Sequence, residues 1–171
     1  MRGGARPRRS ALYVPGSNER ALEKARALDT DVLILDLEDA VAPASKPEAR
    51  RRVAEDLARG GHGHRERVVR VNPLATAWGA EDLPAAARAP ADAVLLPKVE
   101  GPDEVREAER MLDTAAGPGG PSLWAMIETP RGVLRVAEIA AASPRLACLV
   151  AGTSDLVKDL RARHTPSRQE V

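Results

Sequence analysis

The sequence of 171 residues contains no phenylalanine, one tyrosine and two tryptophans. Proteins that bind single-stranded nucleic acid usually stack the bases on aromatic side chains, which this chain lacks. The net charge of +1 also provides no electrostatic attraction for an anionic polymer. We therefore expect no nucleic-acid partner. A single cysteine, Cys148, excludes an internal disulfide and any metal site built from several cysteines.

Long apolar runs are missing as well. No stretch approaches the roughly 18 apolar residues of a membrane-spanning helix, and the N-terminus has no apolar signal region. We therefore expect no membrane partner and a cytoplasmic location. The N-terminus carries several arginines instead, which is typical of a solvated segment. We expect residues 1–8 to be disordered and residues 9–171 to form one domain.

What the sequence does contain is a series of short apolar runs, each followed by turn residues and a helical pattern. They span residues 11–14, 32–35, 67–71, 93–96, 123–127 and 146–151. Runs of this length are typical of buried parallel strands, and the helical segments between them predict an α/β fold with a parallel sheet. Six βα units could form an open doubly wound sheet, or part of a (β/α)8 barrel that needs two further units. The periodicity does not distinguish these two architectures.

Ionisable side chains follow five of the apolar runs. They are Asp36, Glu38 and Asp39 after the second run, Arg70 at the end of the third, Lys98 after the fourth, Glu128 after the fifth and Asp155 after the sixth. In parallel α/β sheets, ligands bind at the carboxyl ends of the strands. The sequence therefore predicts that these side chains converge on one site.

Glu128 and Asp155 are candidate ligands for Mg²⁺, which proteins often hold with two carboxylates while water and substrate fill the remaining positions. The alternative is that each carboxylate only stabilises the start of the helix that follows it.

Arg70 offers a planar fork of donors to a carboxylate or an enolate oxygen. Its alternative role is a structural ion pair with the acids at 36–39. Lys98 could form a Schiff base, but we favour a charged lysine that is paired with an acid. We expect His62 and His64, in a glycine-rich loop, to be exposed and not to bind a metal.

Six segments appear in an order that resembles the citrate lyase beta-subunit-like family, within the HpcH/HpaI aldolase superfamily. They are RSALYVPGSN at 9–18, LDLEDAV at 35–41, VRVNP at 69–73, LPKVE at 96–100, MIETP at 126–130 and GTSDL at 152–156. The resemblance runs from about Arg9 to Thr165. Each segment alone is weak, whereas the ordered set is specific.

The resemblance implies a (β/α)8 TIM barrel, of which this chain holds about six βα units. It also implies Mg²⁺-dependent cleavage or formation of a carbon–carbon bond in a 3-hydroxyacyl thioester of the citryl-, malyl- or citramalyl-CoA type. The implied partners are an acyl-CoA or acyl-carrier thioester and a 2-oxo acid, and the full-length form is expected to be a homo-oligomer.

Carried over by position, the resemblance implies that Glu128 and Asp155 bind the metal, with Glu128 also contacting substrate. It implies that Arg70 is the catalytic arginine that binds substrate and enolate. The acids at 36, 38 and 39 and Lys98 are further candidates. One departure is Ser154, which stands where relatives often have glutamate.

A second departure is length, because relatives continue through two more strands beyond the point that corresponds to Val171. We expect the chain by itself to associate and to be inactive as a thioester lyase. Two alternatives stay open: an aldolase that acts on free 2-oxo acids, and a non-catalytic remnant of the fold.

Overall fold

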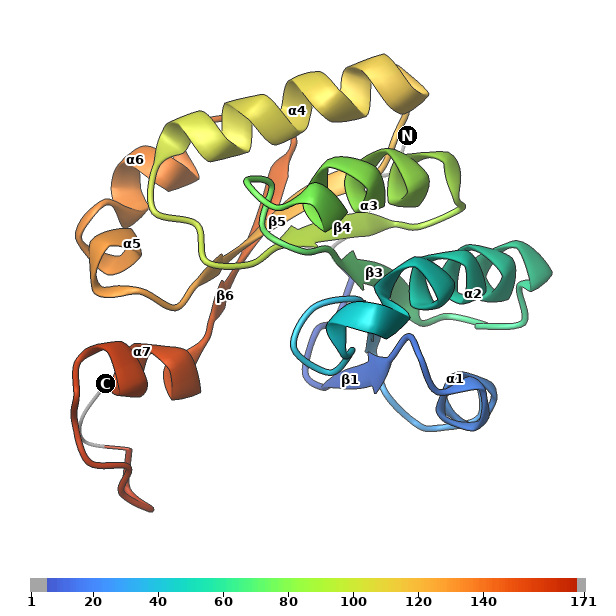
Figure 1. Ribbon diagram of the computed structural model, residues 1–171, viewed down its shortest axis with the longest axis horizontal. Coiled ribbons are helices and arrows are strands. Elements are labelled where there is room, and N and C mark those ends of the chain that lie inside the picture. Colours follow the sequence, from blue (N-terminus) through green and yellow to red (C-terminus); the bar gives the residue numbers. More distant parts are fainter. Residues whose placement is uncertain (1–5, 169–171) are drawn as a thin grey trace.

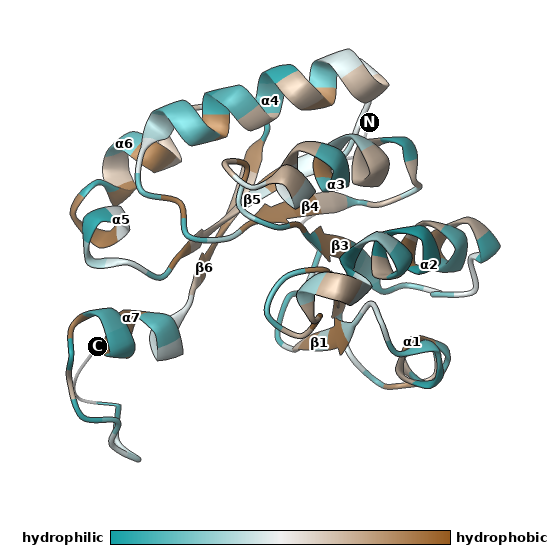
Figure 2. Ribbon diagram, viewed as in Figure 1, coloured by the Kyte–Doolittle hydropathy of each residue, from teal (hydrophilic) through white to brown (hydrophobic). Residues whose placement is uncertain are grey.

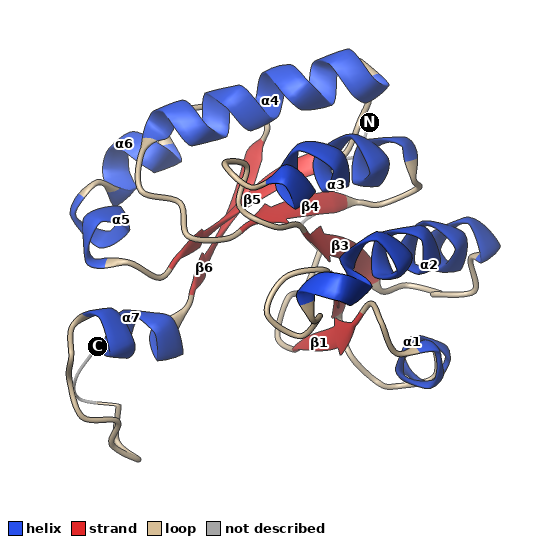
Figure 3. Cartoon of the chain, in the orientation of Figure 1, coloured by secondary structure: helices blue, strands red, loops and turns tan. Residues whose placement is uncertain are grey.

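The computed structural model describes residues 6–168, in which six strands alternate with helices (Figures 1 and 3). The strands are β1 (Ala11–Pro15), β2 (Val32–Asp36), β3 (Glu66–Arg70), β4 (Ala93–Leu96), β5 (Ser122–Ile127) and β6 (Leu146–Ala151). The helices are α1 (Glu19–Ala25), α2 (Lys46–Arg59), α3 (Ala77–Arg88), α4 (Pro102–Ala116), α5 (Pro130–Leu134), α6 (Val136–Ala140) and α7 (Thr153–Asp159), with a short 3₁₀ turn at Pro43–Ser45.

All neighbouring strands are parallel, and their order in the sheet is β1-β2-β3-β4-β5-β6. A doubly wound sheet reverses its strand order at a switch point, whereas a barrel adds each strand beside the previous one. The sequential order therefore confirms the barrel type with six βα units. Within residues 6–168, β1 and β6 each have only one strand neighbour.

The helix boundaries follow from capping residues. Asn18 caps α1 by accepting a hydrogen bond from the backbone N–H of Ala21 at 3.1 Å. Gly60 ends α2 with a φ of 72°, a conformation that glycine adopts without strain. Helix α3 begins at Ala77 because the side chain of Thr76 caps its first turn by accepting a hydrogen bond from the backbone N–H of Gly79. The segment after β5 forms two short helices, α5 and α6, that meet at Arg135.

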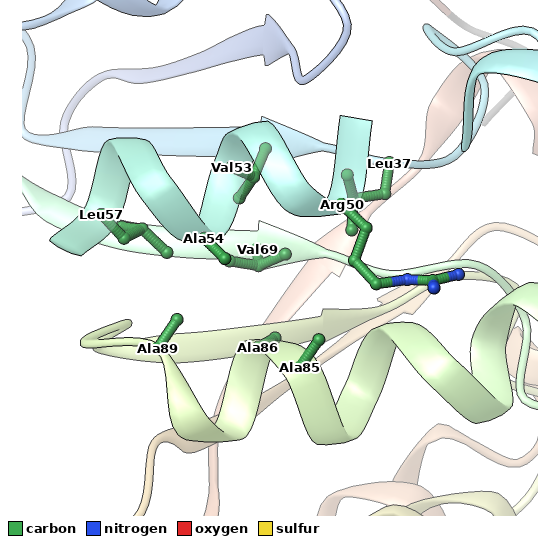
Figure 4. Close-up of a pocket in the computed structure, with 9 residues that line it drawn as sticks. All are labelled: Leu37, Arg50, Val53, Ala54, Leu57, Val69, Ala85, Ala86 and Ala89. Carbon is green, nitrogen blue, oxygen red and sulfur yellow. The ribbon is translucent and has the colours of Figure 1, made fainter. Parts of the chain in front are cut away.

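The sheet is apolar on both faces, which explains why its strands appear as continuous hydrophobic runs. The outer face packs on helices α2, α3 and α4, and the strands are the most hydrophobic parts of the ribbon (Figure 2). The inner face carries a separate cluster made of strand residues: Val32, Ile34, Val68, Ala93, Leu95, Trp124 and Met126. A cavity of only about 10 Å³ lies between α2 and α3 (Figure 4). Its lining is mostly alanine, valine and leucine, so it is a small gap between packed helices and not a ligand site.

The N-terminal segment at residues 6–10 lies across the amino ends of three strands. Each of its three arginines pairs with an acid at the start of a successive strand: Arg9 with Asp31, Arg8 with Glu66 and Arg6 with Asp92. The guanidinium of Arg8 also lies 4.8 Å from the ring of Trp124 on the inner face. Arg6 and Arg8, in the segment expected to be disordered, thus lie beside acids of the sheet, while residues 1–5 of that segment lie outside the described residues.

His62 is buried, with 3% of its surface exposed, although the sequence analysis placed it in solvent. The turn at Gly60 and Gly61, both with positive φ, directs the following residue back toward α2. The Nε2 atom of His62 lies 2.9 Å from a carboxylate oxygen of Asp56, which also pairs with Arg26. His64 is exposed, as expected. None of the helices in residues 6–168 combines the length and apolar character needed to traverse a lipid bilayer.

Large apolar side chains are exposed on both edge strands, Tyr13 on β1 (38%) and Leu149 on β6 (39%), and Leu134 at the end of α5 is 87% exposed. Unpaired strand edges and apolar patches promote association. We therefore expect the 171-residue polypeptide to associate at micromolar concentration, measured by light scattering. Leu149→Lys on the edge strand β6 should reduce this association, because a charge on an edge disfavours strand pairing. A monodisperse monomer of the unaltered chain would contradict the expectation.

Candidate functional site

Arg70 ends β3 on the inner face, in register with Asp36 at the end of β2. Its Nε donates to Oδ1 of Asp36 at 2.7 Å and its Nη2 donates to Oδ2 at 2.6 Å. The ion pair that the sequence analysis named as the alternative is therefore present. It does not exclude ligand binding, since this fork uses two of the five donor hydrogens of the guanidinium.

The remaining Nη1 of Arg70 faces the other acids after β2. It lies 3.0 Å from Oε2 of Glu38, without the geometry of a hydrogen bond, and 3.7 Å from Asp39. Burial acts to lower the pKa of Arg70, but the hydrogen bonds and negative charge of Asp36 outweigh it and hold the pKa above its usual value. Arg70 is thus permanently charged and retains free donors on Nη1.

Lys98 follows β4 in the left-handed region, with a φ of 51°. A non-glycine residue in this region is uncommon and often lies at a functional site. Its Nζ donates to Oε1 of Glu38 at 2.5 Å and lies 3.6 Å from Oδ2 of Asp155. Burial acts to lower the pKa of Lys98, but Glu38 outweighs it and the net shift is upward. This agrees with a charged, paired lysine and opposes a Schiff base, which requires a neutral amine.

Glu128 follows β5 and is 2% exposed. One of its oxygens, Oε1, accepts a hydrogen bond from the backbone N–H of Lys98 at 2.8 Å. Burial raises the pKa of Glu128, the Lys98 N–H and charge oppose this, and the negative charges of Glu38 and Asp155 add to the rise. The carboxylate is therefore fixed in place in surroundings with excess negative charge.

Gly152, between β6 and α7, makes room for this carboxylate. A Cβ at Gly152 would lie 2.5 Å from Cβ of Glu128 and 2.6 Å from its Oε2. The role of Gly152 is not evident from the sequence, because the GTSD segment gives no indication of which side chain packs on it.

Glu128 and Asp155 line one hollow of about 250 Å³ at the carboxyl ends of the strands. The full lining is Asp39, Lys98, Glu128, Thr129, Asp155, Lys158 and Asp159. Both carboxylates also lie at helix starts, since Thr129 caps α5 and Asp155 is in the first turn of α7. The structure therefore brings together the acids and Lys98 after the strands as expected, with Arg70 joined to them through Glu38.

The donor set fits magnesium. Among residues 6–168 no three histidine, cysteine or acidic side chains are grouped so as to hold a metal by themselves. Mg²⁺ does not require such a group, because it usually keeps several waters and takes one or two protein carboxylates plus substrate oxygens. Two carboxylates on an open hollow match this pattern. Burial is the main cause of the upward shift in the pKa of Glu128, and the negative charges of Glu38 and Asp155, which add to it, are charges that a divalent cation would offset.

Gly152→Ala should displace the Glu128 carboxylate, because the new methyl group would overlap it. We expect Mg²⁺ affinity to fall about tenfold, the lower end of the effect of disturbing the groups that orient a ligand. Calorimetry would measure this loss. Gly119→Ala is the matched control, since no atom lies within 4 Å of its added Cβ. Equal affinity in the two variants would show that Gly152 does not position Glu128.

Comparison with known proteins identifies relatives of this chain. Residues 9–171 match the model of the family described as HpcH/HpaI aldolase/citrate lyase. The chain is 52% identical over 164 residues to a (3S)-malyl-CoA thioesterase of Cereibacter sphaeroides, covering 96% of this chain and 55% of that protein. It is 40% identical to the citrate lyase subunit beta of Escherichia coli, covering 97% of this chain and 57% of that protein. The chain thus spans about half the length of these curated relatives.

Solved structures show the same likeness. The citrate lyase beta subunit of Mycobacterium tuberculosis, complexed with oxaloacetate and magnesium, aligns with a TM-score of 0.73 and 35% identity, over 92% of this chain and 65% of that one. A complex of the M. tuberculosis protein CitE with magnesium, acetoacetate and coenzyme A aligns with a TM-score of 0.72 and 35% identity, over 92% of this chain and 54% of that one. The fold, the strand-end residues and these matches together show that the chain belongs to the HpcH/HpaI aldolase/citrate lyase family.

Proposed function

We propose that the protein cleaves or forms the carbon–carbon bond of a 3-hydroxyacyl thioester of the malyl-, citramalyl- or citryl-CoA type, with Mg²⁺. The observation that carries this proposal is the junction of two features at one edge of the sheet. Glu128 and Asp155 line an open hollow, and Arg70 presents its free Nη1 toward Glu38 and Asp39 beside it. The carboxylates suit the cation, and the guanidinium suits an oxyanion.

Each residue then has a defined role. Glu128 and Asp155 would hold the Mg²⁺, which when bound supplies a Lewis acid for the carbonyl and carboxylate oxygens of a 2-oxo acid. In cleavage, the 3-hydroxyl group would lose its proton to solvent water and become the carbonyl of the 2-oxo acid, while the C2–C3 bond breaks and its electron pair moves into the thioester enolate. The enolate would then take a proton from water to give the acyl thioester. Arg70 donates from Nη1 to the enolate oxygen. Because Arg70 is permanently charged, it stabilises this anion and does not exchange the proton.

The ligands named in the solved structures support this assignment. Oxaloacetate and acetoacetate are oxo acids, and both were bound together with magnesium in M. tuberculosis proteins of this fold. Coenzyme A, the thiol that a malyl or citryl thioester would carry, is present in one of those complexes.

Hydrolysis of the thioester is a second candidate function, because the relatives at 52% identity are named (3S)-malyl-CoA thioesterases. The two reactions share a substrate class but break different bonds. Hydrolysis adds water across the C–S bond and releases a free thiol. A lyase breaks the C–C bond, leaves the thioester intact and releases a 2-oxo acid.

The test uses a fusion of residues 1–171 to the part of the C. sphaeroides relative that this chain does not span. The fusion is designed to give the edge strands β1 and β6 pairing partners within one polypeptide. It is compared with the 171-residue chain alone. Malyl-CoA and citramalyl-CoA are added with Mg²⁺ or with EDTA, and free thiol and 2-oxo acid are measured separately. Free 4-hydroxy-2-oxo acids serve as substrates for the alternative aldolase.

Mg²⁺-dependent release of a 2-oxo acid without free thiol is the expected result. Free thiol without 2-oxo acid would assign the thioesterase reaction. Turnover of the free acids alone would assign the aldolase. No turnover of any substrate by the fusion would leave a non-catalytic remnant of the fold.

A further inference from the structure

Tyr13, the only tyrosine of the chain, lies beside Arg70 although the two residues are far apart in the sequence. Tyr13 is on β1 in register with Ile34 on β2, and Arg70 is on β3. The Cζ atom of Arg70 lies 5.0 Å from the centroid of the Tyr13 ring, within the range of a cation–π contact. The sequence analysis did not assign Tyr13 a role.

The guanidinium of Arg70 is thus held from two directions. The fork with Asp36 fixes two donors in the plane of the group, at 2.7 and 2.6 Å. Two parallel hydrogen bonds still allow the plane to tilt about the axis that joins the two groups. The contact with the Tyr13 ring, 5.0 Å from Cζ, restricts that tilt. Without this contact Nη1, which takes no part in the fork, would move most.

The contact depends on the ring and not on the hydroxyl. Within residues 6–168 the Tyr13 hydroxyl makes no hydrogen bond, and the residue is 38% exposed. Burial raises the pKa of Tyr13, so the phenol carries no charge at neutral pH. The contact is therefore one between a cation and a neutral aromatic ring.

We infer that Tyr13 is a positioning residue whose ring fixes the plane of Arg70, so that Nη1 is aimed at the ligand. This inference rests on the proposed function of Arg70 as the group that binds the substrate oxyanion. The geometric part, that the Tyr13 ring orients Arg70, can be tested without any substrate.

The first experiment is NMR of the fusion to the C. sphaeroides relative with ¹⁵N-labelled arginine, in which loss of one Nε–Hε signal in Arg70→Lys identifies Arg70. A ring over the guanidinium shifts the signals of its hydrogens. We expect Tyr13→Phe to keep the shifted signal and Tyr13→Leu to lose the shift, while both variants keep the far-ultraviolet circular dichroism of the wild type. An unchanged Arg70 signal in Tyr13→Leu would overturn the inference.

The second experiment measures thioester cleavage by the same variants in the fusion to the C. sphaeroides relative. Tyr13→Leu should lower kcat about threefold to thirtyfold, the range expected for loss of a partly desolvated cation–π contact. Tyr13→Phe should stay within about twofold of the wild type, because it keeps the ring. If Tyr13→Phe lowered kcat as much as Tyr13→Leu, the inference would be overturned, because the effect would then come from the hydroxyl and not from the ring. Equal turnover in Arg70→Lys and wild type would instead refute the proposed function of Arg70. The NMR result would still show whether the Tyr13 ring contacts and orients Arg70.

Discussion

Arg70→Lys is expected to lower kcat/KM for malyl-CoA about 100-fold in the fusion, equivalent to about 3 kcal/mol of transition-state binding. An ammonium cannot reproduce the planar fork that holds Asp36 through two donors while Nη1 remains free. Steady-state assays of 2-oxo acid release from malyl-CoA would measure the loss. Thermal unfolding of the same variant separates a catalytic loss from unfolding.

Arg67→Lys is the matched control for this prediction. Arg67 is on the same strand, and it binds Asp92 through Nε at 2.9 Å and Nη2 at 3.2 Å. It therefore loses a similar fork at a position remote from the hollow, and turnover should stay within about twofold of the wild type. If Arg70→Lys and Arg67→Lys both keep the turnover of the wild type, Arg70 has only a structural role.

Glu128→Ala is expected to abolish detectable Mg²⁺ binding, because it removes one of the two protein carboxylates on the hollow. Calorimetry with the wild type and the variant would measure this. Glu128→Gln keeps the shape and the hydrogen bond from the Lys98 N–H but removes the charge. It should therefore lose Mg²⁺ as well. Retained affinity in both variants would remove Glu128 from the metal site.

The pH dependence follows from the pKa of Glu128, which burial raises above its ordinary value near 4.5. Only the deprotonated carboxylate binds the cation, so Mg²⁺ affinity is full above the raised pKa and falls as the pH drops through it. The loss should begin at a higher pH than for an ordinary glutamate. Titrations at several pH values would show this, and Glu128→Gln should show no Mg²⁺ binding at any of them.

The sequence predicts the elements and the edge of the sheet at which the site lies. Strand β4 at Ala93–Leu96 and strand β6 at Leu146–Ala151 have the bounds that the apolar runs indicate. The strand-end acids converge because parallel strands place their carboxyl ends on one edge of the sheet. This site is visible in the sequence because each acid closely follows its apolar run. The strand order was not predictable from periodicity, because a doubly wound sheet and a (β/α)8 barrel use the same apolar runs for their strands.

Contacts between distant segments account for what the sequence did not reveal. Arg8 and Glu66 are separated by 58 positions, and nothing local indicates that they pair. The contact of Tyr13 with Arg70 and the packing of Gly152 on Glu128 are of the same kind. His62 appeared exposed because its glycine-rich neighbours are typical of loops, whereas its burial depends on how that loop folds onto Asp56. The family resemblance supplied the roles of Glu128, Asp155 and Arg70, which composition and spacing left open between two readings each.

The most direct measurement is an anomalous-difference map from a crystal of the protein grown with Mn²⁺ in place of Mg²⁺ and with pyruvate. The proposed site predicts one peak in the hollow, about 2.1 Å from a carboxylate oxygen of Glu128 and of Asp155, with the oxo acid completing its shell. A peak elsewhere, or pyruvate bound with no metal between it and Glu128, would contradict the account.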